Sequence, residues 1–303
     1  MNKIGLVVEG GGMKCAYSAG ILDAFLDYKI TFDYCIGVSA GAANLVSYLA
    51  GQRGRNLRFY TEHLKDPGYF GVKSFFKTGN LFGLDYIYRT LSNSAGKDPL
   101  DFPAFKNNPV PFYAVATNAV TGTPEYFSKD LMKQDDYSHI IASCSLPGAC
   151  RPMKINGVPY YDGGISDAIP IERAFLEGCD KIVVILCKPK NFIKPPEKFR
   201  FLYSRMCRNY PNTVQALNQR HIMYRKTRET ALKLEQEQKA FLFAPSTDLK
   251  TNLITMDAKR EQQLYDLGIK DFHTLKEQLE KFLNPASQPE NPAEKSFKDY
   301  ISA

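Results

Sequence analysis

The chain has 303 residues, of which 44% are hydrophobic and 23% charged, and it contains no Trp. This length and composition exclude a largely disordered protein, and they predict one or two domains that need no disulfide or metal to fold. No apolar run approaches the roughly 18 residues of a membrane span, and residues 4–8 are too short for a signal-peptide core. The seven Cys include no C-x-x-C pair, so we expect a reducing, cytoplasmic location.

The net charge of +7 is concentrated in one segment. Between Lys188 and Lys239 the chain carries 13 Lys or Arg and 4 Glu, so the remainder is slightly acidic. Such a segment either forms a solvated helical face or favours an anionic partner: a membrane surface, a nucleic acid or an acidic substrate. Residues 199–208 alternate aromatic side chains with Arg, which is typical of a helix that lies on a membrane. We therefore expect peripheral contact with an anionic membrane through residues 188–239, and no nucleic acid, because no nucleic-acid-binding motif is present.

The N-terminal part alternates strand and helix patterns. Apolar runs at residues 4–8 and 32–36 are typical of buried parallel strands. A glycine loop at residues 9–12 leads to a helix pattern at 14–26, and a tight turn at 37–41 leads to another at 42–49. This order predicts an α/β fold with helices on both faces of a parallel sheet.

The remaining elements are less regular. Further strands are expected at 112–116, 181–186 and 241–243, with hairpin turns at 121–123 and at Asn156-Gly157. Helices are expected at 137–145, at 199–239 with a break at Pro211, and at 256–283 with a break at Gly268. Residues 69–96 and 188–196 are expected to be mainly loops.

Gly37-Val38-Ser39-Ala40-Gly41 matches the pattern G-x-S-x-G. Between a strand and a helix, this motif forms a sharp, strained turn that exposes the serine hydroxyl at the N-terminus of the helix. The glycines on either side let the strand and the helix approach each other closely. The other interpretation is a small-residue turn without a function. The order of strand, turn and helix favours a nucleophilic Ser39.

Gly10-Gly11-Gly12 supplies a second element that acyl transfer needs. Consecutive glycines after a strand can direct their N–H groups to one point and stabilise an oxyanion. The competing interpretation is a loop that binds phosphate. The dinucleotide pattern needs glycine where Cys15 stands, and the P-loop pattern needs Gly-Lys-Ser/Thr where Met13-Lys14-Cys15 stands. Both nucleotide interpretations are weakened, although the acidic Asp33 follows about 20 residues later.

A nucleophilic serine needs a base, and the four histidines are poor candidates. None of them lies in a glycine-rich turn or directly after a strand, so each is expected to be a surface or packing residue: His63, His139, His221 and His273. Asp162 is followed by Gly163-Gly164 at the end of a predicted strand. This arrangement leaves the carboxylate open to a neighbouring hydroxyl, and a Ser–Asp dyad needs only that contact. A plain turn is the alternative for this motif taken alone.

Together the three motifs resemble those of the patatin-like phospholipase family. The family pattern is G-G-G-x-R/K-G, then G-x-S-x-G, then Asp-Gly-Gly or Asp-Gly-Ala. Here it is matched by residues 10–15, 37–41 and 162–164, and residues 142–147 form a fourth family-like segment. The resemblance covers about residues 4–187. The chain departs from the pattern at Cys15, where the family usually has glycine.

The resemblance implies a three-layer α/β/α fold with a mainly parallel central sheet and a C-terminal helical extension. It implies a serine acyl hydrolase that cleaves lipid esters through an acyl-enzyme, with Ser39 as nucleophile and Asp162 as base. The backbone N–H groups of Gly10, Gly11, Gly12 and Met13 would form the oxyanion hole. No metal or cofactor is required. Asp167 is expected to be a turn or cap residue.

Three regions follow from this comparison. Residues 1–187 would form the catalytic core, residues 188–284 a basic helical region that completes or caps it, and residues 285–303 a flexible tail. The aromatic-rich stretch at 69–88 is expected either to line an acyl groove or to belong to the core. The alternative function is a catalytically weak or inactive binding or regulatory protein with the same fold. The motifs do not distinguish phospholipids from other lipid esters.

Overall fold

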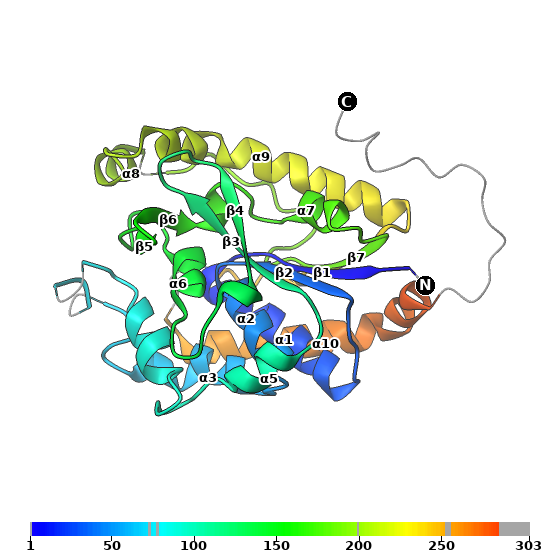
Figure 1. Ribbon diagram of the computed structural model, residues 1–303. Coiled ribbons are helices and arrows are strands. Elements are labelled where there is room, and N and C mark those ends of the chain that lie inside the picture. Colours follow the sequence, from blue (N-terminus) through cyan, green and yellow to red (C-terminus); the bar gives the residue numbers. More distant parts are fainter. Residues whose placement is uncertain (1, 72–73, 77–78, 199, 252–255, 285–303) are drawn as a thin grey trace.

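The computed structural model describes residues 2–71, 74–76, 79–198, 200–251 and 256–284 (Figure 1). In these ranges the strands form one eight-stranded sheet with the order β5-β6-β3-β2-β1-β7-β8, and β4 pairs with β3. The strands are β1 (Ile4–Val8), β2 (Tyr34–Val38), β3 (Phe112–Asn118), β4 (Pro124–Ser128), β5 (Met153–Ile155), β6 (Val158–Asp162), β7 (Lys181–Ile185) and β8 (Ala240–Phe243).

The centre of the sheet is parallel. Strand β1 pairs with β2 and β7, β2 with β3, and β7 with β8, all in the parallel sense. The antiparallel pairs involve β3, β4, β5 and β6 at one side. The central strands are apolar and almost wholly buried because helices cover both faces.

Helices form the two outer layers (Figure 1). One layer contains α7 (Ile171–Leu176), α8 (Arg200–Met206) and α9 (Pro211–Gln236). The other contains α1 (Ala16–Asp27), α2 (Ala40–Leu49), α3 (Arg55–Thr61), α5 (Phe102–Asn107) and α10 (Ala258–Leu283), while α6 (Ser138–Cys144) lies beside β3 and β6. Short helical turns are η1 (Gly12–Cys15), η2 (His63–Lys65), η3 (Tyr86–Leu91), η4 (Lys129–Leu131) and η5 (Gly163–Ile165). The three-layer α/β/α arrangement predicted from the sequence is confirmed.

Two apolar clusters join the layers. One packs α1, α2 and α10 on their side of the sheet, around Leu6, Phe25 and Phe272. The other packs α7 and α9 on the opposite side, and it includes Val7 and Ile36 from the central strands. Because neighbouring residues of a strand point to opposite faces, Leu6 and Val7 belong to different clusters.

Most predicted strands and hairpins are confirmed, and two details are wrong. The strand expected at 32–36 is β2, Tyr34–Val38. Gly37 and Val38 therefore belong to the strand and not to the turn, because Gly37 pairs with Val8 of β1 and with Ala114 of β3. The extents predicted for the core and the basic region stay predictions, and the tail predicted at 285–303 lies outside the described residues.

The second correction concerns Gly268, which does not break α10. Because glycine has no side chain, Gly268 instead allows close packing between two helices. A Cβ at Gly268 would lie 2.3 Å from the carbonyl oxygen of Tyr17 on α1, and one at Gly20 would lie 2.2 Å from the carbonyl oxygen of Tyr265. The two glycines therefore let α1 and α10 approach backbone to backbone. The hydroxyl of Tyr265 also donates to Asp23 at 2.8 Å.

Replacing Gly268 with alanine tests this contact. At an exposed helix position, alanine stabilises the helix by about 1 kcal/mol relative to glycine. At position 268, however, the methyl group of alanine would force α1 and α10 apart. We expect the free energy of unfolding to fall by about 2 kcal/mol and the melting temperature to fall by about 5 °C. Thermal unfolding followed by circular dichroism measures both quantities. Gln263→Ala, at an exposed position of the same helix, is the matched control, and a G268A variant as stable as the wild type contradicts the packing argument.

Candidate active site

Ser39 lies where β2 ends and α2 begins, in a backbone conformation that few residues adopt. Its φ is 53° and its ψ is −131°. The flanking glycines are needed for contact: a Cβ at Gly37 would lie 2.7 Å from Cα of Ala42, and one at Gly41 would lie 2.5 Å from the carbonyl oxygen of Glu9. Positive φ at a residue other than glycine costs on the order of 1–3 kcal/mol and is concentrated at functional sites.

Two hydrogen bonds fix the turn that contains Ser39. The N–H of Ser39 donates to Oγ of Ser143 at 2.8 Å, and Oγ of Ser143 donates to the carbonyl oxygen of Val115 at 2.6 Å. Ser143 is fully buried at the end region of α6. The turn is therefore connected to strand β3 through the buried hydroxyl of Ser143. The family-like segment 142–147, which contains Ser143, thus contacts the backbone of Ser39.

Asp162 is the last residue of β6 and precedes η5. The N–H of Gly164 donates to its Oδ1 at 2.7 Å, which fixes the carboxyl group. A Cβ at Gly163 would lie 2.2 Å from the carbonyl oxygen of Val115, so the chain can turn here only without a side chain. Local contacts thus involve both glycines of the Asp-Gly-Gly motif: Gly163 leaves room for the carbonyl oxygen of Val115, and Gly164 donates to Asp162.

The structure brings Ser39 and Asp162 together. Both residues line one cavity, and both are largely buried. Burial raises the pKa of the Asp162 carboxyl above its ordinary value, although a side-chain hydrogen bond with Ser39, the charge of Arg220 and the Gly164 N–H all act in the opposite direction. A carboxylate with a raised pKa beside a hydroxyl is a stronger proton acceptor than an exposed aspartate.

The glycine loop lines the same cavity. Gly10, Gly11, Gly12 and Met13 all contribute to its wall. Within the described part of the chain, the N–H groups of Gly11, Gly12 and Met13 donate no hydrogen bond, as expected at the N-terminus of η1. The loop packs tightly, since a Cβ at Gly10 would lie 3.1 Å from Cβ of Ser39. These free donors are available to an oxyanion beside Ser39.

Glu9, which the sequence reasoning missed, anchors the start of this loop. Its side chain is buried and accepts hydrogen bonds from the hydroxyl of Tyr224 at 2.6 Å and from the N–H of Cys187 at 2.7 Å. Tyr224 belongs to α9, so the C-terminal region holds the glycine loop in place. An acidic residue directly after a buried strand is the sequence signal that could have indicated such a role.

Cys15, the departure from the family pattern, is buried beneath the loop and does not line the cavity. Its Sγ lies 3.2 Å from Sγ of Cys187. Its carbonyl oxygen accepts from the side chain of Asn44 on α2 at 2.8 Å. A residue with a side chain is therefore accommodated at position 15, and residues 10–13 still line the cavity.

Apolar side chains form the remaining wall of the cavity. They come mainly from α3 and from the segment 69–88: Phe59, Tyr60, Tyr69, Phe82, Leu84 and Ile87. Part of the predicted aromatic stretch thus lines the cavity. Phe76 does not, and it is 82% exposed. Cys144 also lines the cavity, next to Ser39, and burial raises the pKa of its thiol.

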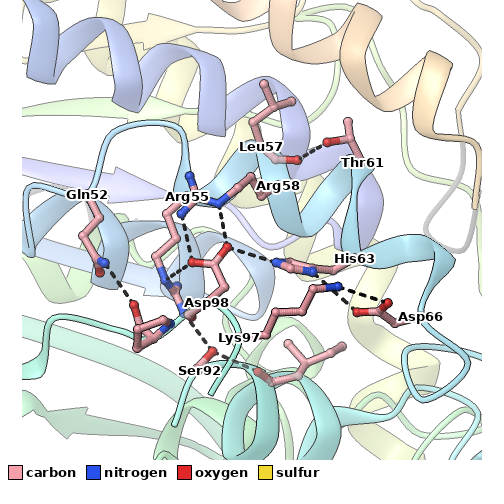
Figure 2. A network of polar contacts seen from close by, with 12 residues as sticks. Gln52, Arg55, Leu57, Arg58, Thr61, His63, Asp66, Ser92, Lys97 and Asp98 are labelled. Carbon is pink, nitrogen blue, oxygen red and sulfur yellow. Dashed lines mark hydrogen bonds and ion pairs between the residues drawn. The ribbon is translucent and has the colours of Figure 1, made fainter. Parts of the chain in front are cut away.

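A buried network around Asp98 fixes α3, the helix that carries part of this wall (Figure 2). The Asp98 carboxylate accepts from Arg58 Nε at 2.6 Å and lies 3.0 Å from Nε2 of His63. Arg55, which lines the cavity, donates to Ser47 and Ser92 and lies 3.5 Å from Asp98. Burial lowers the pKa of Arg55 to about 10, so it remains charged at neutral pH. Through these contacts the segment around Asp98 holds α3 against the cavity.

In the described part of the chain, no histidine lines the cavity that contains Ser39. His63 belongs to the buried Asp98 network, which agrees with the packing role expected for it. Arg220 of α9 does line the cavity. The sequence reasoning placed Arg220 only in a basic segment, because its position in the chain gives no sign that α9 returns to the carboxyl ends of β1 and β2.

Comparison with known proteins identifies the class of this fold and site. The sequence profile described as patatin-like phospholipase matches residues 6–175. The chain therefore belongs to the patatin-like phospholipase family. A second profile, described as a domain of unknown function, matches residues 210–284. The match to the first profile contains all the predicted site residues, whereas Arg220 and Tyr224 lie in the second.

Relatives share only part of their length with this chain. The uncharacterized protein YjjU of Escherichia coli is 32% identical over 204 residues, which are 66% of this chain and 56% of that protein. Lysophospholipases from Aspergillus fumigatus and Cryptococcus neoformans are 26% and 28% identical, over 60% and 61% of this chain but only 12% and 11% of their own length. The structure of VipD from Legionella pneumophila aligns with a TM-score of 0.47 at 14% identity, covering 91% of this chain and 67% of VipD.

Ser143→Ala tests the support beneath Ser39. The substitution leaves the buried N–H of Ser39 without an acceptor, which costs about 1–3 kcal/mol of folding free energy. We expect the melting temperature to fall, because the turn loses its tie to β3. Ser145→Ala is the matched control, since among the described residues the hydroxyl of Ser145 bonds only to the carbonyl oxygen of Ile141 in the same helix region. Equal effects of the two variants contradict the role assigned to Ser143.

Proposed function

We propose that this protein is a serine hydrolase of lipid carboxylic esters and that Ser39 and Asp162 form its catalytic dyad. The observation that carries the proposal is the convergence of Ser39, Asp162 and residues 10–13 on one cavity. Membership of the patatin-like phospholipase family supports the class of substrate.

In the first half-reaction, Oγ of Ser39 attacks the ester carbonyl while Asp162 accepts the hydroxyl proton. The negative charge on the carbonyl oxygen is stabilised by the free N–H groups of residues 11–13, which are fixed before the reaction begins. The tetrahedral intermediate then expels the alcohol, to which Asp162 returns the proton. The acyl group remains bound to Ser39.

In the second half-reaction, Asp162 accepts a proton from water, and the resulting hydroxide attacks the acyl-enzyme. Collapse of the second tetrahedral intermediate releases the fatty acid and returns the proton to Ser39. The apolar wall from α3 and residues 69–88 suits the acyl chain, because burying each methylene contributes about 0.8 kcal/mol.

Two variants test the dyad. Ser39→Ala and Asp162→Asn are each expected to lower kcat/KM for a short-chain nitrophenyl ester by at least about a thousandfold. The amide oxygen of the D162N variant can still accept from the Gly164 N–H, but the amide cannot take the proton. Circular dichroism checks that both variants remain folded. Wild-type turnover no faster than that of S39A favours the alternative, a binding or regulatory protein with this fold.

We also propose that the basic segment 188–239 docks on an anionic membrane, with a cytoplasmic location for the enzyme. Among the described helices, none is both long and apolar enough to cross a bilayer. Docking is supported by exposed large apolar side chains in the same segment as the exposed Arg200, Arg205 and Arg208: Phe201, Met206, Ile222 and Met223. Each basic residue near anionic lipid contributes about 1 kcal/mol.

Phe201→Ser tests this docking surface. Phe201 is 83% exposed, so its loss should leave folding intact but weaken binding to phosphatidylserine-rich vesicles by about tenfold. Vesicle flotation measures the bound fraction, and added salt should reduce it. Leu131→Ser, at a 54% exposed position outside the segment, is the matched control. Equal binding of the wild type to purely zwitterionic vesicles contradicts the electrostatic part of the proposal.

A further inference from the structure

Arg220 is held at the active-site cavity by its neighbours. It lies on α9, within the residues matched by the profile of unknown function. Its Nε donates to the carbonyl oxygen of Gly164, two residues after Asp162. Its Nη1 donates to Oε1 of Glu197 at 3.1 Å. Two of its three nitrogen atoms are therefore engaged, and the guanidinium plane is fixed beside the Asp-Gly-Gly turn.

The third nitrogen, Nη2, is free to bind a ligand. It makes no hydrogen bond with any residue that the structure describes, and it is not among the described side-chain atoms that are buried without a partner. The side chain is 14% exposed and lines the cavity that contains Ser39 and Asp162. Arg55 also lines this cavity, but its Nη1 and Nη2 both donate to buried neighbours.

Glu197 is shared between two cations, so it does not neutralise Arg220 alone. Glu197 accepts from Lys194 at 2.9 Å and from Arg220 at 3.1 Å, so one carboxylate faces two cations. Burial raises the pKa of Glu197, but the charges of Arg220 and Lys194 outweigh this effect and hold it below its usual value. Arg220 also favours the ionised form of the nearby Asp162 carboxyl, which is the proton acceptor in the proposed mechanism. Nη2 is therefore a charged donor that can bind a further anion in the cavity.

The position of Arg220 assigns this anion to one side of the ester. The apolar wall of the cavity comes from α3 and from the segment 69–88, whereas Arg220 comes from α9. Helices α3 and α9 lie on opposite sides of the sheet (Figure 1). If the acyl chain occupies the apolar wall, the alcohol part of the ester lies toward Arg220. A guanidinium matches the geometry of phosphate oxygens better than an ammonium does.

On these grounds we propose that Arg220 is a specificity-determining residue, which recognises a phosphate group on the alcohol side of the ester. The inference rests on the proposed hydrolase function and gives the C-terminal region a direct part in the site. Through Nη2 the region of unknown function would select anionic esters over neutral ones.

The experiment compares two monomeric short-chain esters that share one acyl group: a 1-acylglycerol and its 3-phosphate. In the full-length chain, Arg220→Gln should lower the kcat/KM ratio of phosphate ester to neutral ester by at least tenfold, mainly through KM. Arg220→Lys should restore part of this ratio. Lys226→Gln removes the same charge from an exposed position of α9 and is the matched control.

Equal losses on both esters would overturn the proposal, because they would mean that Arg220 only positions the Asp162–Gly164 turn. Binding of glycerol 3-phosphate, measured by calorimetry, separates this inference from the proposed function. The wild type and S39A should bind it, and R220Q should bind at least tenfold more weakly. If no variant hydrolyses an ester, this binding still decides the role of Arg220, and no binding by the wild type overturns it.

Discussion

The strained backbone of Ser39 is the constraint around which the site is built. A φ of 53° at this residue costs free energy, which the hydrogen bond to Ser143 and the burial of the central strands offset. Gly41 permits the turn, because a Cβ there would clash with the carbonyl oxygen of Glu9. In return, the turn holds the hydroxyl at the edge of the sheet where β1 and β2 end. The glycine loop and Asp162 reach the same edge, so one geometry serves the proposed nucleophile, base and oxyanion donors.

The C-terminal region takes part in this geometry and does more than cover the core. Strand β8 extends the sheet beside β7, and α10 packs on α1 through paired glycines. Helix α9 reaches the site at two points: Tyr224 binds Glu9 at the start of the glycine loop, and Arg220 binds the turn after Asp162. Both partners of α9 lie within the family-matched residues 6–175. The two matched regions therefore meet at the cavity that contains Ser39 and Asp162.

The sequence predicted the parts that depend on local patterns. The apolar runs of β1 and β7, the hairpin at Asn156-Gly157 and the motifs at 37–41 and 162–164 each carry a physical signal within a few residues. The contacts of Glu9, Ser143 and Arg220 could not be predicted, because each depends on a partner far away in the chain. Gly268 was misread for the same reason: the break expected from helix propensity is overridden by packing against Tyr17, about 250 residues earlier.

The central claim is that Asp162 takes the proton of Ser39, and covalent labelling by a fluorophosphonate tests it most directly. The labelling rate would be followed against pH for the wild type and D162N, with the modified peptide identified by mass spectrometry. The account predicts modification at Ser39, at a rate that falls in acid with a midpoint above 3.8, the ordinary pKa of aspartate, because burial raises the pKa of Asp162. It predicts that D162N reacts at least about a hundredfold more slowly. Labelling of D162N at the wild-type rate, or of another residue, would contradict it.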